Sequence, residues 1–263
     1  MVRFTVVKWQ KSDGIGLVTL NRPEKLNAMN PQLLADLREI LEEAEKDEEV
    51  KVLVLTGTGK GFCAGGDVEE HPGFKNDNPL IREKYLKEVQ HVTLLLHRMP
   101  KPVIAAINGI AAGGGLDMAM ACDIRIASEE ALFTEVSVRA GLMPDMGGTY
   151  FLPRLVGVSK ALEMIFTGDT IDAQEALRIG LVNQVAPDQE LINRAMAMAK
   201  RLAQGPSQSY RFCKWAVYRG LDIELEAALE HELFGQNLLL DTEDVQEANK
   251  AFAEKRKPIF KGR

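Results

Sequence analysis

Short apolar runs of strand length alternate with stretches of helical periodicity in the first half of the chain. Residues 4–9 and 15–20 are rich in β-forming side chains, and the Asp13-Gly14 pair between them is typical of a hairpin turn. Asn30-Pro31 supplies a helix N-cap and a first-turn proline, and apolar residues then recur at helical spacing over 33–44. The pattern predicts a β-hairpin followed by an amphipathic helix.

Three further apolar runs, residues 52–56, 103–107 and 124–127, predict strands. The first is continuously apolar, as in a strand that is buried on both faces. Residues 86–99 have helical periodicity, and Pro100-Lys101-Pro102 ends the predicted helix. Strands that alternate with helices indicate an α/β core.

The second half of the chain is predominantly helical in its pattern, with one strand-like run at residues 181–185. Gly205-Pro206 precedes three predicted helices that carry much of the charge. We therefore expect a core over residues 1–204 and a C-terminal helical region over residues 205–263.

Composition narrows the function classes. The chain has 263 residues, 46% of them hydrophobic, and a net charge of −6. A mildly acidic chain without a basic run argues against a nucleic-acid binder and against a polybasic membrane anchor. The longest apolar stretch, residues 103–122, contains Asn108, Asp117 and four glycines. It is expected to be buried in the protein and not to cross a bilayer.

Cysteine and histidine spacing predicts neither disulfides nor a metal site. Cys63, Cys122 and Cys213 are far apart and odd in number, which favours packed or free thiols in a reducing cytoplasm. Four histidines lack ligand spacing and are expected to be ordinary solvated or packed side chains: His71, His91, His97 and His231.

Two glycine clusters, residues 61–67 and 108–115, each follow a β-run. The first overlaps a formal match to the nicotinamide-binding fingerprint, but Gly65-Gly66 stand where a smooth helix should begin, so this role is disfavoured. Glycine allows close backbone approach and leaves N–H groups free to point outward, here at the start of a helix predicted over 115–121. The clusters either form an oxyanion hole together or are two tight turns required for close packing.

Two aspartates are the acid–base candidates. Asp117 lies two residues after the glycine triplet in an otherwise apolar helix, where an ionised carboxylate needs a partner or a task. Asp145 lies between Met143 and Met146, surroundings that raise a carboxyl pKa as a proton shuttle requires. Its alternative role is an N-cap for the helix that begins around Gly147.

With these motifs in place, the chain resembles the crotonase (enoyl-CoA hydratase/isomerase) superfamily over nearly its whole length. The matching segments are residues 20–28, 62–67, 101–109, 113–115, 121–123, 141–149, 152–157, 167–168, 176–182 and 257–263. The resemblance implies an α/β fold, a crotonase-like spiral of ββα units with a C-terminal helical trimerisation region. It also implies a homo-trimer, or a hexamer built as a dimer of trimers.

The resemblance further implies an acyl-CoA thioester substrate, with CoA as part of the substrate and no separate cofactor. The backbone N–H groups of Gly66 and Gly114 would bind the thioester oxygen. The positions that the resemblance assigns to CoA are Leu26, Ala28, Ala64, Phe260 and Lys261. The last two lie in the C-terminal tail, which in this superfamily is often donated by a neighbouring subunit.

The chain departs from typical hydratases, which carry a Glu two residues after the glycine triplet and a second Glu twenty residues later. Asp117 and Ser137 hold these positions here, and a serine cannot replace a carboxylate. Asp145 stands where hydratases commonly carry a small residue and several other branches carry an Asp.

A double-bond shift needs one carboxylate, whereas hydration is naturally shared between two. We therefore expect an enoyl- or dienoyl-CoA isomerase with Asp145 as proton shuttle and Asp117 assisting or structural. The alternative is hydration of a 2-enoyl- or cyclic dienoyl-CoA by Asp117 and Asp145 together. Dehalogenation is disfavoured because Gln90, with His91 next to it, holds that branch's imidazole position and Ser137 its tryptophan position. A non-catalytic CoA-ester or protein-binding member is the remaining class.

Overall fold

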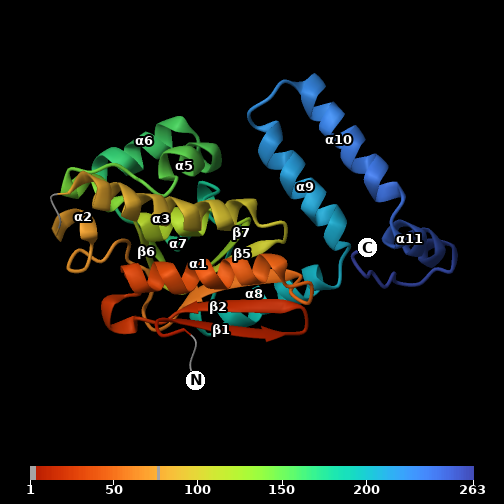
Figure 1. Cartoon of the computed structure of the whole chain (residues 1–263), viewed down its shortest axis with the longest axis horizontal. Coiled ribbons are helices and arrows are strands. Elements are labelled where there is room, and N and C mark those ends of the chain that lie inside the picture. The colour runs from red at the N-terminus through yellow and green to blue at the C-terminus, as the bar shows by residue number, and fades with distance from the viewer. Residues whose placement is uncertain (1–3, 76–77) are drawn as a thin grey trace.

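The computed structural model describes residues 4–75 and 78–263, and a six-stranded sheet forms its centre (Figure 1). The first two strands form the predicted hairpin, with Asp13 and Gly14 both at positive φ (52° and 78°) in its turn, and every other pairing in the sheet is parallel. Its strands, in spatial order, are β1 (Val7–Ser12), β2 (Ile15–Leu20), β3 (Val52–Gly57), β5 (Val103–Ile107), β7 (Ile124–Ser128) and β10 (Gln184–Ala186).

A second, smaller sheet is built from strands of two or three residues, which the sequence pattern does not predict. In spatial order they are β4 (Gly61–Cys63), β6 (Ile110–Ala112), β8 (Leu132–Thr134) and β9 (Ile171–Asp172). The first three run parallel and β9 is antiparallel. Each long strand β3, β5 and β7 is followed by one of these short strands, and for the first two a helix comes next. This repetition of ββα units is the spiral that the sequence motifs indicate.

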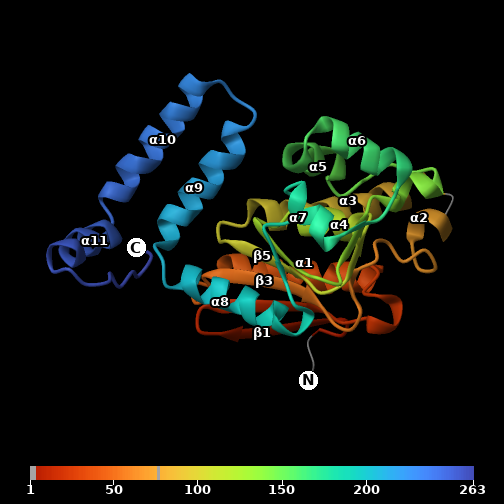
Figure 2. The same cartoon turned by 180° about the vertical axis from the view of Figure 1, so that it is seen from behind.

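Helices cover both faces of the main sheet (Figures 1 and 2). One face carries α1 (Pro31–Lys46), whose N-cap Asn30 accepts the Leu33 N–H at 2.8 Å, and α3 (Pro79–Arg98), which ends before Pro100. The other face packs against α8 (Leu191–Ala203) through a buried apolar cluster. The remaining core helices are α2 (Pro72–Lys75), α4 (Gly114–Met120), α5 (Gly148–Val156), α6 (Val158–Thr167), α7 (Ala173–Arg178) and three short 3₁₀ segments, Pro23–Lys25, Val136–Ala140 and Asp188–Glu190.

Three C-terminal helices extend from the core: α9 (Ser207–Gly220), α10 (Leu225–Leu240) and α11 (Glu243–Ala253) (Figures 1 and 2). They begin after Gly205-Pro206, as the sequence predicts. Large apolar side chains on α10 are exposed, namely Leu225, Leu229, Leu233, Phe234, Leu238 and Leu240. A trimer-forming role for this region stays a prediction.

The apolar stretch at residues 103–122 is divided among β5, β6 and α4 in the interior. Among the described residues, no helix has both the length and the apolar character that a bilayer crossing requires. Cys63 and Cys122 are packed in the interior, as the sequence predicts, whereas Cys213 is exposed.

A largely buried polar network connects α9 to the core. The Lys214 ammonium lies 2.8 Å from one carboxylate oxygen of Asp123, which also accepts the Val103 N–H at 2.7 Å. The Tyr218 hydroxyl donates to the other oxygen at 2.9 Å. Both charged side chains are largely buried, at 12% and 16% exposure, so the pair is weakly screened by solvent.

We expect Lys214→Met to lower the free energy of unfolding by about 3 kcal/mol, because it leaves the Asp123 carboxylate unpaired in a largely dry site. Lys87→Met is the matched control, because Lys87 pairs with Glu83 on the exposed surface of α3. Its effect should stay within about 0.5 kcal/mol. Urea unfolding of the two variants measures the difference, and equal effects would contradict the assigned role of the network.

Candidate active site

The first glycine turn presents the N–H of Gly66 to a ligand. A single parallel bridge joins Gly66 to Met29: the Met29 N–H donates to the Gly65 carbonyl at 2.7 Å, and the Asp67 N–H donates to the Met29 carbonyl at 2.9 Å. Because a parallel bridge uses the groups on either side of its central residue, the Gly66 N–H points away from Met29. Gly65 has φ +93°, a conformation that favours glycine.

The second turn presents the N–H of Gly114, the first residue of α4. Gly113 precedes it at φ +48° and anchors the turn by donating its N–H to the Thr134 carbonyl at 2.9 Å. As a first-turn residue, Gly114 has no acceptor for its N–H within the helix. This N–H is therefore available to a ligand, and the helix dipole favours a negatively charged one.

The two turns are in direct contact. A Cβ atom on Gly115 would lie 2.0 Å from the Cys63 carbonyl oxygen, and one on Gly65 would lie 3.7 Å from the Gly114 nitrogen. The close packing of the two glycine turns is therefore present. An oxyanion hole formed by the N–H groups of Gly66 and Gly114 stays a prediction, which this contact between the turns makes geometrically reasonable.

Asp117 is fully buried in the first turn of α4, three residues after Gly114. Its side chain is 0% exposed, and its Oδ2 accepts the backbone N–H of Met146 at 3.2 Å. Burial is the largest cause that raises the pKa of Asp117, to about 7. The carboxyl group thereby holds the segment that carries Asp145.

Asp145 is exposed, and it lines a cavity that is described below. Partial desolvation by the surrounding protein raises the pKa of its carboxyl group, whereas the positive charge of a protonated His71 lowers it. The alternative N-cap role is wrong. Helix α5 begins at Gly148, and its N-cap is Gly147 at φ +100° with no side-chain cap, two residues beyond Asp145. The carboxylate is therefore available for chemistry.

Glu135 is a buried acid that the sequence motifs do not single out. It directly precedes a 3₁₀ helix over residues 136–140, so the strand pattern of side chains does not apply to this segment. Glu135 is 0% exposed and lies against the carboxyl group of Asp117. The Ser137 hydroxyl lies at the Gly113 turn, 3.6 Å from where a Cβ on Gly113 would be.

His71 also belongs to this region, although its isolated position in the sequence suggested an ordinary side chain. Its ring Cδ2 would lie 3.3 Å from a Cβ on Gly66, and its ring packs edge-on against Tyr85 of α3 at 4.5 Å between centroids. Desolvation lowers the pKa of His71, and the charge of Asp145 acts against that shift. Only the fold could show this, because the residue carries no motif.

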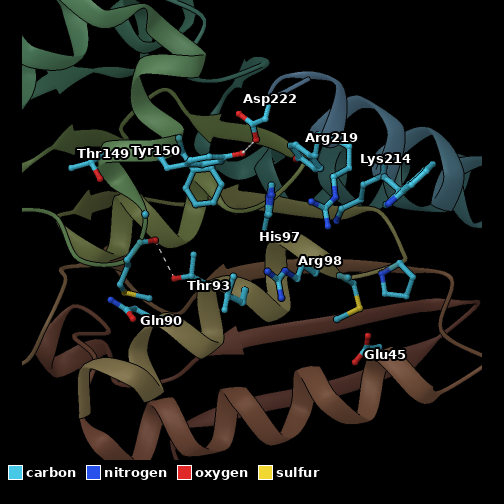
Figure 3. A pocket seen from close by; sticks show the side chains of 18 of the residues that line it. Glu45, Gln90, Thr93, His97, Arg98, Thr149, Tyr150, Lys214, Arg219 and Asp222 are labelled. Carbon is cyan, nitrogen blue, oxygen red and sulfur yellow. Dashed lines mark hydrogen bonds between the residues drawn. The ribbon is translucent and has the colours of Figure 1, made fainter. Parts of the chain in front are cut away.

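A cavity of about 1020 Å³ lies between α3, the segment from Met143 to Phe151, and α9 (Figure 3). Gln90, Thr93 and His97 of α3 line it, and the Thr93 hydroxyl donates to the Met146 carbonyl at 3.1 Å. Asp145 and Met146 line the same cavity, and Met146 Sδ would lie 2.8 Å from a Cβ on Gly114. Met146 thus connects the cavity with the glycine turns.

The structure brings three of the five residues assigned to CoA to the first glycine turn. The Ala64 N–H donates to the Leu26 carbonyl at 3.0 Å, and Arg22 holds the adjacent Ala28 carbonyl at 2.6 Å. Leu26 and Asn27 both have positive φ (48° and 58°), and the Asn27 side chain stabilises this bend by donating to the Gly61 carbonyl at 2.7 Å.

Phe260 and Lys261 are not brought to the site of their own chain. The Lys261 N–H donates to Asp244 of α11 at 2.7 Å. The tail lies at the other end of the molecule from α2, which follows the first glycine turn (Figures 1 and 2). A CoA contact through these residues would have to be made in a neighbouring subunit.

Within the described parts of the chain, no cluster of three histidine, cysteine or acidic residues could hold a metal ion. Gln90 lines the cavity, whereas the His91 ring pairs with Glu42 on the exposed side of α3 at 3.4 Å. His91 therefore does not replace the imidazole that a dehalogenase requires.

Comparison with known proteins identifies the class to which this fold and site belong. The family model described as enoyl-CoA hydratase/isomerase matches residues 10–263. The chain is 42% identical over 251 residues to the short-chain-enoyl-CoA hydratase of Clostridium acetobutylicum, covering 94% of each chain. It is 41% identical over 260 residues to the (E)-benzylidenesuccinyl-CoA hydratase of Thauera aromatica, covering 97% of this chain and 99% of that one.

Among solved structures, the enoyl-CoA hydratase from Bacillus anthracis superposes with a TM-score of 0.94 at 35% identity, covering 98% of this chain and 100% of the other. The chain belongs to the enoyl-CoA hydratase/isomerase family, has the crotonase fold, and is an enzyme of that family.

Proposed function

We propose that the protein is an acyl-CoA double-bond isomerase of the enoyl- or dienoyl-CoA type, with Asp145 as its proton shuttle. The observation that carries this proposal is the difference in exposure between the two aspartates. Asp145 is exposed to the cavity, whereas Asp117 is 0% exposed and holds a backbone N–H. One accessible carboxylate is what a double-bond shift needs.

In the proposed reaction the Asp145 carboxylate removes a proton from the α-carbon of a 3-enoyl thioester. The electrons move to the thioester oxygen and form a dienolate, which the N–H groups of Gly66 and Gly114 stabilise by about 3–4 kcal/mol each in the transition state. Asp145 then returns the same proton to the γ-carbon, which gives the 2-enoyl thioester. The proton and electron count balances without a cofactor, and CoA is part of the substrate.

Hydration is the second candidate, and it is favoured by the names of the two relatives above, both of which are called hydratases. In this case Asp117 and Asp145 would share the activation of water and the protonation of the α-carbon. The raised pKa of Asp117, about 7, suits a group that exchanges a proton near neutral pH. For this reaction the buried Asp117 would need access to the substrate.

Product mass separates the two reactions. The purified enzyme is incubated with 3-enoyl-, 2-enoyl-, dienoyl- and cyclic acyl-CoAs, and the products are identified by mass spectrometry and NMR. Isomerisation leaves the mass unchanged and moves the double bond, whereas hydration adds one water. Addition of water to a 2-enoyl-CoA without any double-bond shift would overturn the isomerase proposal in favour of hydration.

The pH dependence of the isomerisation should show an acid limb governed by Asp145. The group must be ionised to act as the base, and partial desolvation raises its pKa. We therefore expect kcat/KM to fall, as pH decreases, at a higher pH than an ordinary aspartate would give. A pH–rate profile of the wild-type enzyme measures the limb, and activity that is constant down to the ordinary aspartate range would contradict this role.

The proposal includes a homo-trimer, or a hexamer formed by two trimers, in which the tail residues Phe260 and Lys261 contact CoA bound to a neighbouring subunit. The exposed apolar face of α10 and the distance of the tail from its own site support it. Sedimentation of the full chain measures the oligomeric state directly.

A further inference from the structure

A buried pair of acids lies behind Asp145. Glu135, between the end of β8 and the following 3₁₀ helix, is 0% exposed and lies against Asp117 of α4. Among the described residues, neither carboxyl oxygen of Glu135 has a hydrogen-bond donor, and Oδ1 of Asp117 also has none in good geometry, although the nearby Gly148 N–H acts to lower the Asp117 pKa. If both groups were ionised, these three buried carboxyl oxygens would face one another with no proton between them. A proton is present only if one of the two groups is a neutral acid.

The charges around the pair make two ionised carboxylates unfavourable. The charges that act on Glu135 are those of Asp117 and Asp145, and both are negative. Burial and these neighbours raise the pKa values of both members of the pair.

The other charged and titratable side chains nearby are engaged elsewhere. Arg139, on the 3₁₀ helix, pairs with Asp169 at 3.6 Å. His71 acts on Asp145, and the Tyr85 phenol of α3 has its own pKa raised to about 12, so it stays neutral. One proton shared within the pair is the arrangement that leaves the fewest unsatisfied groups.

We propose that Glu135 is a positioning residue, a neutral acid that donates its proton to Oδ1 of Asp117. Oδ2 of Asp117 then remains free to accept the backbone N–H of Met146, and Met146 directly follows Asp145. A hydrogen bond from a carboxylic acid to a carboxylate is short and strong because the acceptor is charged. Glu135 thus orients the Asp145 segment through Asp117. The catalytic part of this inference rests on the proposed function, in which Asp145 transfers the proton.

Two substitutions of Glu135 separate positioning from simple packing. In Glu135→Gln the side-chain amide supplies a permanent N–H donor to Asp117, so turnover at neutral pH should stay close to that of the wild type. In Glu135→Leu the volume is kept but the donor is lost. The segment that carries Asp145 is then loosened, and turnover should fall by about 10²-fold.

The pH profile distinguishes the donor further. At alkaline pH the wild-type pair loses its proton, the two carboxylates repel each other, and turnover should fall. The Glu135→Gln variant should lack this alkaline limb, because its amide donor does not titrate. Equal turnover for the Gln and Leu variants, or an alkaline limb unchanged in Glu135→Gln, would overturn the proposal.

Stability gives a test that is independent of activity. Glu135 binds its proton more tightly in the folded state than in the unfolded state, so stability is full below the unfolded pKa and decreases as pH rises toward the folded pKa. Urea unfolding at several pH values should show this decrease in the wild type and a smaller one in Glu135→Gln. Parallel curves would overturn the shared proton.

Asp117→Asn serves as the second variant if Glu135→Gln does not fold. Its amide would donate to an ionised Glu135, so the decrease in stability with pH should again become smaller. The two proposals fail separately. Full turnover in Asp145→Asn would remove the proposed function but not the pair, whereas parallel stability curves would remove the pair but leave Asp145 as the shuttle.

Discussion

Asp145→Asn should reduce isomerisation of a 3-enoyl-CoA by about 10²–10⁴-fold, the range that removal of a general acid–base group typically costs. The amide keeps the shape of the carboxyl group but cannot accept the α-proton. KM should change little, because the two backbone donors at Gly66 and Gly114 are untouched. Steady-state turnover measures this, together with exchange of the α-proton for deuterium in deuterated water.

Asp169→Asn is the control for this substitution. Asp169 is an exposed aspartate whose side chain pairs loosely with Arg139 at 3.6 Å, outside the cavity. Its turnover and exchange rate should match the wild type. Near-full turnover in Asp145→Asn would show that another group moves the proton, and Asp117 would then be the first candidate.

Gly115→Ala should lower turnover by about 10²–10³-fold, comparable to the loss of one oxyanion donor. Its Cβ would lie 2.0 Å from the Cys63 carbonyl oxygen, a backbone atom that cannot rotate away. The turn that carries Gly66 and the turn that carries Gly114 must therefore move apart. Overpacking of this kind also costs about 1–3 kcal/mol of stability.

The measurement is turnover alongside the affinity for a CoA ester that cannot react. We expect turnover to fall by more than affinity, because the donors act mainly on the oxyanion of the transition state. Gly220→Ala is the control, since a Cβ there meets no atom within 4 Å. Full activity in folded Gly115→Ala would contradict the dependence of the hole on this contact.

Much of the main sheet and its helices could be predicted from the sequence because β3 and β5 are continuous apolar runs and because α1 and α3 have a cap or a proline boundary. Asn30 caps α1 and Pro100 follows α3, as expected. The strands of the second sheet have two or three residues, too few to show any periodicity. They lie partly within glycine clusters that were interpreted as turns.

At the site, the meeting of two glycine turns followed from their places after successive strands. The role of Glu135 could not be predicted, because its direction depends on a 3₁₀ helix that the local sequence does not specify. His71 was missed for another reason. Its closeness to Gly66 and Tyr85 depends on the path of the chain between the first glycine turn and α3.

The division of the site between main chain and side chains has a consequence for evolution and design. The proposed oxyanion donors are backbone N–H groups whose turns are held by the contact between Gly115 and Cys63 and by the bridge at Met29. The groups proposed to move protons are side chains on separate segments. A substitution at position 117, 135, 137 or 145 can therefore change which bond the enzyme makes while the means of forming an enolate is inherited intact. If the proposed oxyanion hole is correct, libraries restricted to these four positions would explore new reactions without disturbing it.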